Sequence, residues 1–179
     1  LKKKYMLTDP IFTQKSVLVQ RMPKDWGKMS TENEVESQLL RSPLDLSGKA
    51  VHVTKGLHSA KVLEHLSEEI GDTIYVKECD TLNPIELIRM VNEGQIDYTI
   101  VDEYIAKMTA YNLSSLDTKL AVSIEQPIGW AVKRQNNDSS LIKAINDWID
   151  HAEQKHLRRI MLRYIKNGQY ISSRREEST

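Results

Sequence analysis

The stretch Val91-Asn-Glu-Gly-Gln-Ile-Asp-Tyr-Thr-Ile-Val-Asp-Glu-Tyr104 decides the fold. Gly94 follows an amphipathic run, at the position where a glycine in the left-handed conformation closes a helix. Ile96–Val101 is mostly apolar and rich in β-branched and aromatic residues, which is typical of a strand covered on both faces. Asp102 stands where this strand ends, and a new helical pattern starts at once. The stretch therefore predicts a helix, a buried strand and a second helix.

Asp102 is also the first candidate for contact with a ligand. In open α/β sheets, ligands bind outside the carboxyl ends of the strands. An aspartate directly before a helix is, however, a common N-cap. Position alone favours the cap.

Composition restricts the classes of function. The chain has 179 residues, with 25 Lys and Arg against 25 Asp and Glu, which does not indicate binding to nucleic acid. Cys79 is the sole cysteine and the five histidines lack metal-ligand spacing, so we expect no internal disulfide, no metal and no other cofactor. No segment is apolar enough to span a membrane, and no signal peptide is visible. Because the chain starts at Leu1 without a methionine, and within a sequence pattern rather than at its beginning, we expect it to be a piece of a longer protein.

Strands and helices alternate along most of the chain. Lys49–Val53 is a predicted strand, and the next helix has Ser59 as its predicted cap and Gly71 as its stop. Asn83-Pro84 is a typical helix start. Strands joined by helices run parallel, so we expect a mainly parallel sheet with helices on both faces. The other predicted strands are Ser16–Gln20, Thr73–Lys77, Leu120–Val122 and Ile128–Val132, and the other predicted helices are Asn33–Leu40, Glu103–Tyr111, Asn136–Ile149 and Gln154–Ile165.

The segment Thr54-Lys-Gly-Leu-His-Ser59 joins a strand to a helix. Its glycine and the helix that follows expose backbone N–H groups, which favour a carboxylate or phosphate. Parallel strands would bring this segment and Asp102 to the same edge of the sheet. A loop with Lys55 and N–H groups on one strand, and a carboxylate on the next, suits a zwitterion such as an amino acid or peptide.

Other chemistry is weakly supported. His58 and Ser59 are adjacent, which rarely gives a working catalytic pair, and no nucleophile elbow is present. We interpret Glu32, Glu34 and Glu36 as solvated. Trp130 and Trp148 are predicted to lie in the core, whereas Trp26 is a candidate surface contact.

Four motifs in order resemble the second lobe of the type-3 extracellular solute-binding proteins, which include the amino-acid receptors of ABC importers. The motifs are Asp9-Pro-Ile with Ser16-Val-Leu-Val, Leu46-Ser-Gly-Lys-Ala-Val-His-Val-Thr-Lys-Gly-Leu-His-Ser59, Asn92–Asp102 and Gln126-Pro-Ile-Gly-Trp-Ala-Val132. The resemblance implies a periplasmic-binding-protein-like fold of type II. It also implies carboxylate contacts near Thr54, His58 and Ser59, and an ammonium contact at Asp102, which reverses the preference for a cap. His58 and Leu57 depart from the usual small residues there and leave room for a larger ligand.

The sequences Gly-Gln-Ile-Asp-Tyr-Thr-Ile-Val-Asp and Glu125-Gln-Pro resemble in particular the sensor region of membrane-bound lytic transglycosylase F. That family joins a solute-binding-like module to a domain that cleaves peptidoglycan. The resemblance implies four segments: residues 1–20 crossing from a missing first lobe, 21–132 as the second lobe, 133–165 as helices returning to the first lobe, and 166–179 as a polar linker.

The function expected from this resemblance is sensing, not catalysis. The module would bind a small zwitterion, an amino acid or muropeptide, and regulate a catalytic domain outside this chain. We expect a periplasmic protein associated with the outer membrane, whose partners are its own first lobe and catalytic domain. Two alternatives stay open: an amino-acid receptor of an ABC importer, and a dehydratase-type enzyme on the same fold.

Overall fold

The computed structural model describes residues 4–111, 113–133 and 139–152, together with 156, 159, 160 and 163. The predicted helix start at Asn136–Asp138, most of the predicted helix Gln154–Ile165 and the predicted tail 166–179 lie outside the described residues. The chain forms two compact units. The sheet unit is Lys15–Ile124, and the smaller unit combines Leu1–Gln14 with Glu125–Thr179. The boundaries of these units differ from those of the predicted segments 1–20 and 21–132, which remain a prediction about the whole protein.

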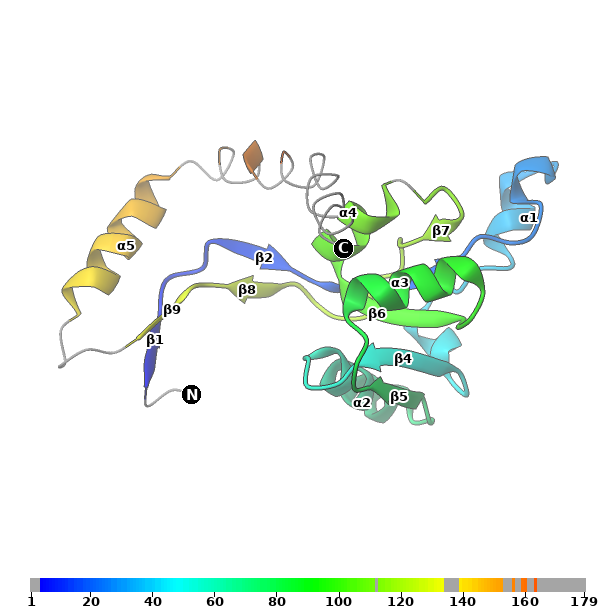
Figure 1. Cartoon of the computed structure of the whole chain (residues 1–179), viewed down its shortest axis with the longest axis horizontal. Helices are drawn as coiled ribbons and strands as arrows, with labels where there is room; N and C mark the ends of the chain where they lie inside the picture. Colours follow the sequence, from blue (N-terminus) through cyan, green and yellow to red (C-terminus); the bar gives the residue numbers. More distant parts are fainter. Residues whose placement is uncertain are drawn as a thin grey trace, which may run out of the picture. The chain divides into compact units, whose positions relative to one another are not determined.

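The sheet unit is built on one mixed sheet of five strands in the order β5-β4-β6-β3-β7. Figure 1 labels β4, β5, β6 and β7 of this sheet. Strand β4 pairs in parallel with both β5 and β6, and the central strand β6 also pairs with β3, which runs antiparallel to β6 and β7. The predicted α/β fold is confirmed, with parallel pairing confined to three of the strands. The strands are β3 Ser16–Arg21, β4 Ala50–Thr54, β5 Tyr75–Cys79, β6 Tyr98–Asp102 and β7 Leu116–Asp117.

Neighbouring side chains of a strand point to opposite faces of the sheet, and here both faces carry apolar side chains. Helices cover each of them. On one face, α2 (Ser59–Ile70) packs its buried side chains with those of β4, such as Val51 and Val53. On the other face, α3 (Pro84–Glu93) and α4 (Glu103–Ala110) pack with Val17, Val19 and Val101. Each face thus has its own apolar core.

The ends of α2 and α3 follow their sequence signals. Gly71 and Gly94 take left-handed φ angles of 69° and 83° at the two C-caps, as predicted. Asn83 accepts hydrogen bonds from the N–H groups of Ile85 and Glu86, and the Glu86 carboxylate accepts from the Asn83 N–H. This capping box fixes where α3 begins.

The connection from β3 to β4 is long and contains three short helical segments: η1 Trp26–Lys28, α1 Glu32–Glu36 and η2 Pro43–Leu46. The predicted helix around Asn33–Leu40 is therefore present in shorter form, and Thr31 caps it. Trp26 is exposed, which agrees with its prediction as a surface residue.

In the part of the smaller unit that the structure describes, the elements are two short antiparallel pairs and the helix α5 (Ser140–His151). The pairs are β1 Tyr5–Leu7 with β9 Ala131–Lys133, and β2 Phe12–Gln14 with β8 Gln126–Ile128. The predicted strand Ile128–Val132 is thus divided between β8 and β9. The predicted strand Leu120–Val122 is reduced to a single bridge between Ala121 and Val17 in the sheet unit.

Candidate functional site

The two segments predicted to form a site end on neighbouring parallel strands. His52 of β4 lies opposite Thr99 of β6, two residues before Thr54 and three before Asp102. Because β4 and β6 run in the same direction, their carboxyl ends meet at one edge of the sheet. We call this edge, with Thr54–Ser59 and Asp102, the rim.

The turn from β4 into α2 is shaped by Gly56, whose φ angle of 79° is in the left-handed region that favours glycine. The Lys55 N–H donates to the Cys79 carbonyl at 3.0 Å, which ties the turn to β5. His58 occupies the N-cap position of α2 without a side-chain capping bond, and Ser59 is the first helical residue. The prediction of Ser59 as the cap is therefore wrong by one position.

The N-terminus of α2 gives the rim a positive character. The first N–H groups of an α-helix have no acceptor within the helix, and the helix dipole adds partial positive charge there. The His58 carbonyl already accepts from the Val62 N–H at 3.1 Å, so the helix is regular from its first turn. His58 is exposed and Ser59 is partly buried.

Thr54 and Lys55 both have partners on the loop after β5. The Thr54 hydroxyl donates to the Leu82 carbonyl at 2.9 Å. The Lys55 ammonium lies 2.7 Å from the Asp80 carboxylate, and both side chains are more than half exposed. Sequence reasoning missed Asp80, although it follows the end of β5 just as Asp102 ends β6. An exposed pair of this kind is weak and exchanges partners at little cost.

Asp102 has extended backbone torsions at the N-cap position of α4, but its side chain makes no capping hydrogen bond to that helix. It is partly buried and lies opposite Ser16 of β3. The Ser16 N–H donates to the Ser123 hydroxyl at 2.9 Å, which places a second serine, also missed from the sequence, at this end of β3. Asp102 thus occupies the N-cap position of α4, but its side chain does not cap that helix.

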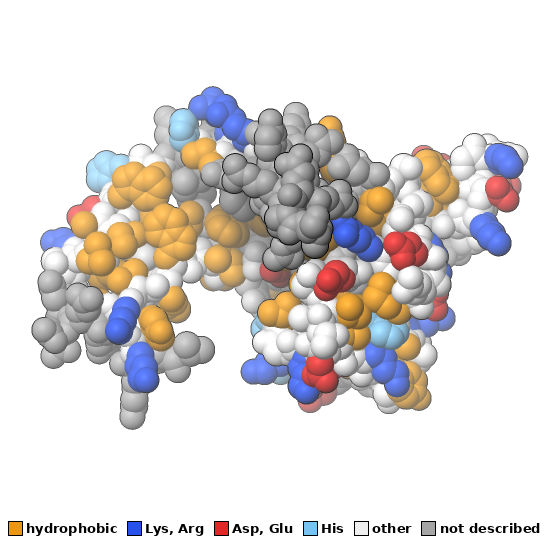
Figure 2. Space-filling view, viewed as in Figure 1, with side chains coloured by type: hydrophobic (Ala, Val, Ile, Leu, Met, Phe, Trp, Pro, Cys, Tyr) orange, Lys and Arg blue, Asp and Glu red, His pale blue; other side chains and the backbone are white. Residues whose placement is uncertain are grey.

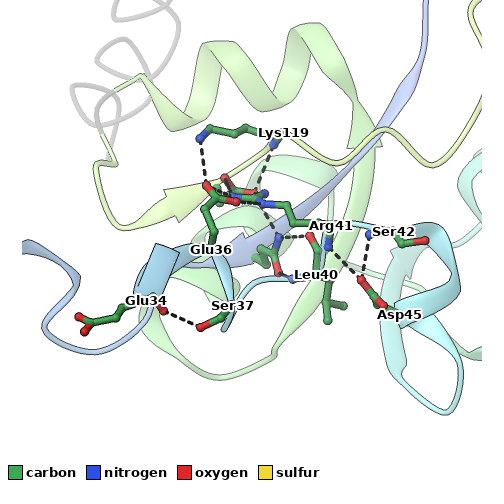
Figure 3. A network of polar contacts seen from close by, with 10 residues as sticks. Glu34, Glu36, Ser37, Leu40, Arg41, Ser42, Asp45 and Lys119 are labelled. Atoms are coloured by element: carbon green, nitrogen blue, oxygen red, sulfur yellow. Dashed lines mark hydrogen bonds and ion pairs between the residues drawn. The ribbon is translucent and has the colours of Figure 1, made fainter. Parts of the chain in front are cut away.

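A second polar cluster lies at the β7 edge of the sheet, around the buried carboxylate of Asp117. Figure 3 labels its members Glu36, Arg41 and Lys119. Asp117 accepts hydrogen bonds from Gln20 and, through both of its oxygens, from Arg41. Arg41 also contacts Glu36, and Lys119 lies 3.4 Å from Glu36. The Arg41 hydrogen bond is the main cause that lowers the pKa of Glu36. The cluster fastens α1 to the sheet, so Glu36 is an ion-pair partner and not merely solvated.

In the smaller unit, Trp130 and Trp148 stack with ring centroids 6.3 Å apart and planes 11° apart. Each is 52% exposed, so the prediction that both lie in the core is wrong. They line an apolar hollow of about 320 Å³ with Ala144 and Ile145. Figure 2 shows the hydrophobic side chains gathered over α5.

Neither a metal cluster nor a membrane helix emerges from the described part of the chain. Among residues 4–111, 113–133 and 139–152, no group of three or more His, Cys, Asp or Glu side chains could hold a metal ion. Within the same ranges, no helix combines the length and the apolar character needed to cross a bilayer.

No family model matches the chain. Among curated proteins, the membrane-bound lytic murein transglycosylase F of Stutzerimonas stutzeri is 35% identical over 124 residues, which are 69% of this chain and 25% of that protein. The same protein of Pseudomonas fluorescens is 32% identical over 121 residues, or 67% of this chain and 24% of that protein. The chain thus spans about a quarter of the length of the curated relatives it matches.

Solved structures share the fold. An ancestral arginine-binding protein bound to arginine has a TM-score of 0.63 and 23% identity, over 92% of this chain and 65% of that one. A structure concerning glutathione import via GshT and the cystine ABC importer TcyBC of Streptococcus mutans has a TM-score of 0.65 and 20% identity, over 92% of this chain and 64% of that one. The predicted periplasmic-binding-protein-like fold is confirmed.

Proposed function

Because this chain has a periplasmic-binding-protein-like fold and is homologous to part of the membrane-bound lytic murein transglycosylases F, we propose that it is a solute-sensing module of a larger cell-envelope protein. The module regulates a peptidoglycan-cleaving domain elsewhere in that protein and works in the periplasm, at the outer membrane. The names of the relatives support the membrane association and the murein substrate of the whole protein.

The main support for a sensing role is that the rim has positively polarised groups at the end of one strand and a carboxylate at the end of the next. The α2 N-terminus and Lys55 stand at the end of β4, and Asp102 stands at the end of its parallel neighbour β6. We assign the carboxylate of a small zwitterion to the α2 N–H groups with His58 and Ser59, and its ammonium to Asp102. An amino acid or muropeptide carries both groups.

The rim geometry refines the roles of the two remaining residues. The resemblance placed Thr54 at the ligand carboxylate, but its hydroxyl already donates to the Leu82 carbonyl, so its oxygen is left as an acceptor and we move it to the ammonium end of the ligand. Lys55 exchanges its exposed pair with Asp80 for the ligand carboxylate. Leu57, which is 47% exposed, adds an apolar surface for a ligand larger than a free amino acid.

The stacked tryptophans support a first lobe as the partner of the smaller unit. Each of its strand pairs has only three residue pairs, and isolated two-stranded ladders are marginally stable. The exposed Trp130–Trp148 hollow gives such a lobe an apolar surface to cover. The solved structures of this fold extend well beyond the part that this chain matches.

The test is calorimetry on the longer protein that carries this module, with amino acids and muropeptides as titrants. Asp102→Ala removes the ammonium contact, and we expect affinity to fall about tenfold or more, since a charge-assisted hydrogen bond is lost. Glu69→Ala, which removes an exposed carboxylate near the C-terminal end of α2, is the control. Unchanged affinity in a folded Asp102→Ala protein would refute the site.

An amino-acid receptor of an ABC importer is the second candidate, supported by the arginine-binding and importer-related structures of the same fold. The sequence that follows Thr179 in the gene separates the two candidates. A transglycosylase domain there supports the sensor, and its absence supports the receptor.

A further inference from the structure

A buried polar pair lies between β4 and β6, away from the rim. The Nδ1 atom of His52 and the Oγ1 atom of Thr99 are both buried and make no hydrogen bond to the described residues. The two residues lie opposite each other in the parallel register; Thr99 is fully buried, whereas His52 is partly buried with its Nδ1 atom on the buried side. Two such buried atoms on paired residues are unusual, because nearly all buried polar groups are hydrogen-bonded.

Helix α3 covers this face of the sheet. Its buried side chains Leu87, Ile88 and Val91 pack with Val17 and Val19 of β3, and Val19 lies opposite Thr99. The buried positions of α3 and α4 carry only apolar side chains. The buried side chains of α3 and α4, Leu87, Ile88, Val91 and Ala106, therefore offer no negative charge to a protonated His52.

The charged groups near His52 come from the strands on either side. Lys77 of β5 lies opposite His52 and is exposed, and Asp97 stands just before β6. Asp97 is itself paired with Arg21 at 2.9 Å. Cys79, two residues after Lys77, is a partly buried thiol on the same face. Burial, reinforced by Lys77 and opposed by Asp97, lowers the pKa of His52 from its ordinary value of 6.5.

We propose that His52 is an acid-sensitive switch of the sheet unit, neutral when β4, β6 and α3 are packed together and protonated when they loosen. Protonation gives both ring nitrogens of His52 an N–H group and puts a positive charge on a ring whose Nδ1 atom is buried beneath α3, which costs free energy unless the layer opens. Because β4 and β6 both continue to the rim, the loosening reaches Lys55 and Glu103. That consequence for the rim bears on ligand binding only if the proposed function holds.

The test is a pH titration of this chain by NMR, followed through the ring signals of its histidines. We expect the ring of His52 to titrate clearly below 6.5, the ordinary value for histidine. The backbone amides of Lys55 and Glu103 should follow the same titration, which requires no ligand. A ring that titrates at or above 6.5 would overturn the proposal.

A second measurement uses the variant His52→Gln, which cannot titrate, with His65→Gln as control. His65 lies on α2 with an exposed side chain. Between pH 7.5 and pH 5 we expect the denaturant midpoint of the wild type and of His65→Gln to fall, and that of His52→Gln to change much less. An equal fall in all three proteins would contradict the switch. If His52→Gln does not fold, the wild-type titration still decides, and it can fail while ligand binding at the rim is intact.

Discussion

At the level of single residues, Asp117 is a buried charge held by two side chains, Gln20 and Arg41. Its carboxylate is 4% exposed and accepts from Gln20 at 3.1 Å and from Arg41 at 2.7 and 3.1 Å. Hydrogen bonds to Glu36 first, and then to Asp117, hold the pKa of Arg41 above its ordinary value. A buried carboxylate that loses such a partner keeps its desolvation cost without the compensation.

We therefore expect Arg41→Ala to lower the free energy of unfolding by about 3 kcal/mol, because the buried carboxylate loses a charged partner. Lys119→Ala is the matched control: its side chain is 69% exposed and reaches Glu36 at 3.4 Å. That change should cost less than about 0.5 kcal/mol, as exposed ion pairs do. Urea unfolding followed by circular dichroism measures both. Similar losses in the two variants would show that Asp117 does not depend on Arg41.

Residue-level contacts were also where sequence reasoning reached its limit. The sequence placed Thr54, Lys55 and Asp102 at strand ends, and the parallel register of β4 and β6 brings those ends together. It could not show that Lys55 pairs with Asp80, because that contact depends on how the loop after β5 folds back. The rim could thus be located from the sequence, but not the partners of its side chains.

At the level of elements, prediction succeeded where a local chemical signal marks a boundary. Asn83-Pro84 begins α3, and Gly71 and Gly94 end α2 and α3, since these residues satisfy helix ends with their own atoms or torsions. Ile128–Val132 has no such signal. A short apolar run looks the same whether it joins a large sheet or pairs with a crossover segment, as β8 and β9 do.

The tryptophans show a related limit. Trp148 belongs to an apolar stripe of α5, and such a stripe predicts that one face of a helix is covered. It does not predict what covers that face. Trp148 is half exposed within this chain, so the pattern was real while its interpretation as core was wrong.

The two helix starts differ in a way that can be measured. Asn83→Ala removes a side chain that accepts from two N–H groups at 2.9 and 3.0 Å, so we expect a loss of about 1 kcal/mol in the free energy of unfolding. Ser59→Ala should change it by less than about 0.5 kcal/mol, because Ser59 is the first helical residue and not the cap. Chemical denaturation compares them. A loss for Ser59→Ala as large as that for Asn83→Ala would show that Ser59 caps α2 after all.

At the level of the whole molecule, acid should destabilise the protein in two separate pH ranges. His52 has a lowered pKa when folded, so the unfolded chain binds more protons as the pH falls below 6.5, and stability is lost there first. Asp72 titrates lower. Its hydrogen bond from the Ser47 hydroxyl, with a second from the Thr73 N–H, lowers the pKa of Asp72 from its ordinary value of 3.8.

The sign for Asp72 is the usual one for a carboxylate. The folded protein holds Asp72 ionised more strongly than the unfolded chain does, so its contribution is present above pH 3.8 and is lost as the pH falls further. Asp72→Asn should flatten the lower range of a plot of unfolding free energy against pH and leave the range near pH 6 unchanged. Ser47→Ala should flatten the lower range in part, because it removes the main donor and leaves the Thr73 N–H. An unaltered slope below pH 4 in both variants would show that this carboxylate is not linked to folding, and would assign the acid loss to other groups such as Glu36, whose pKa Arg41 lowers.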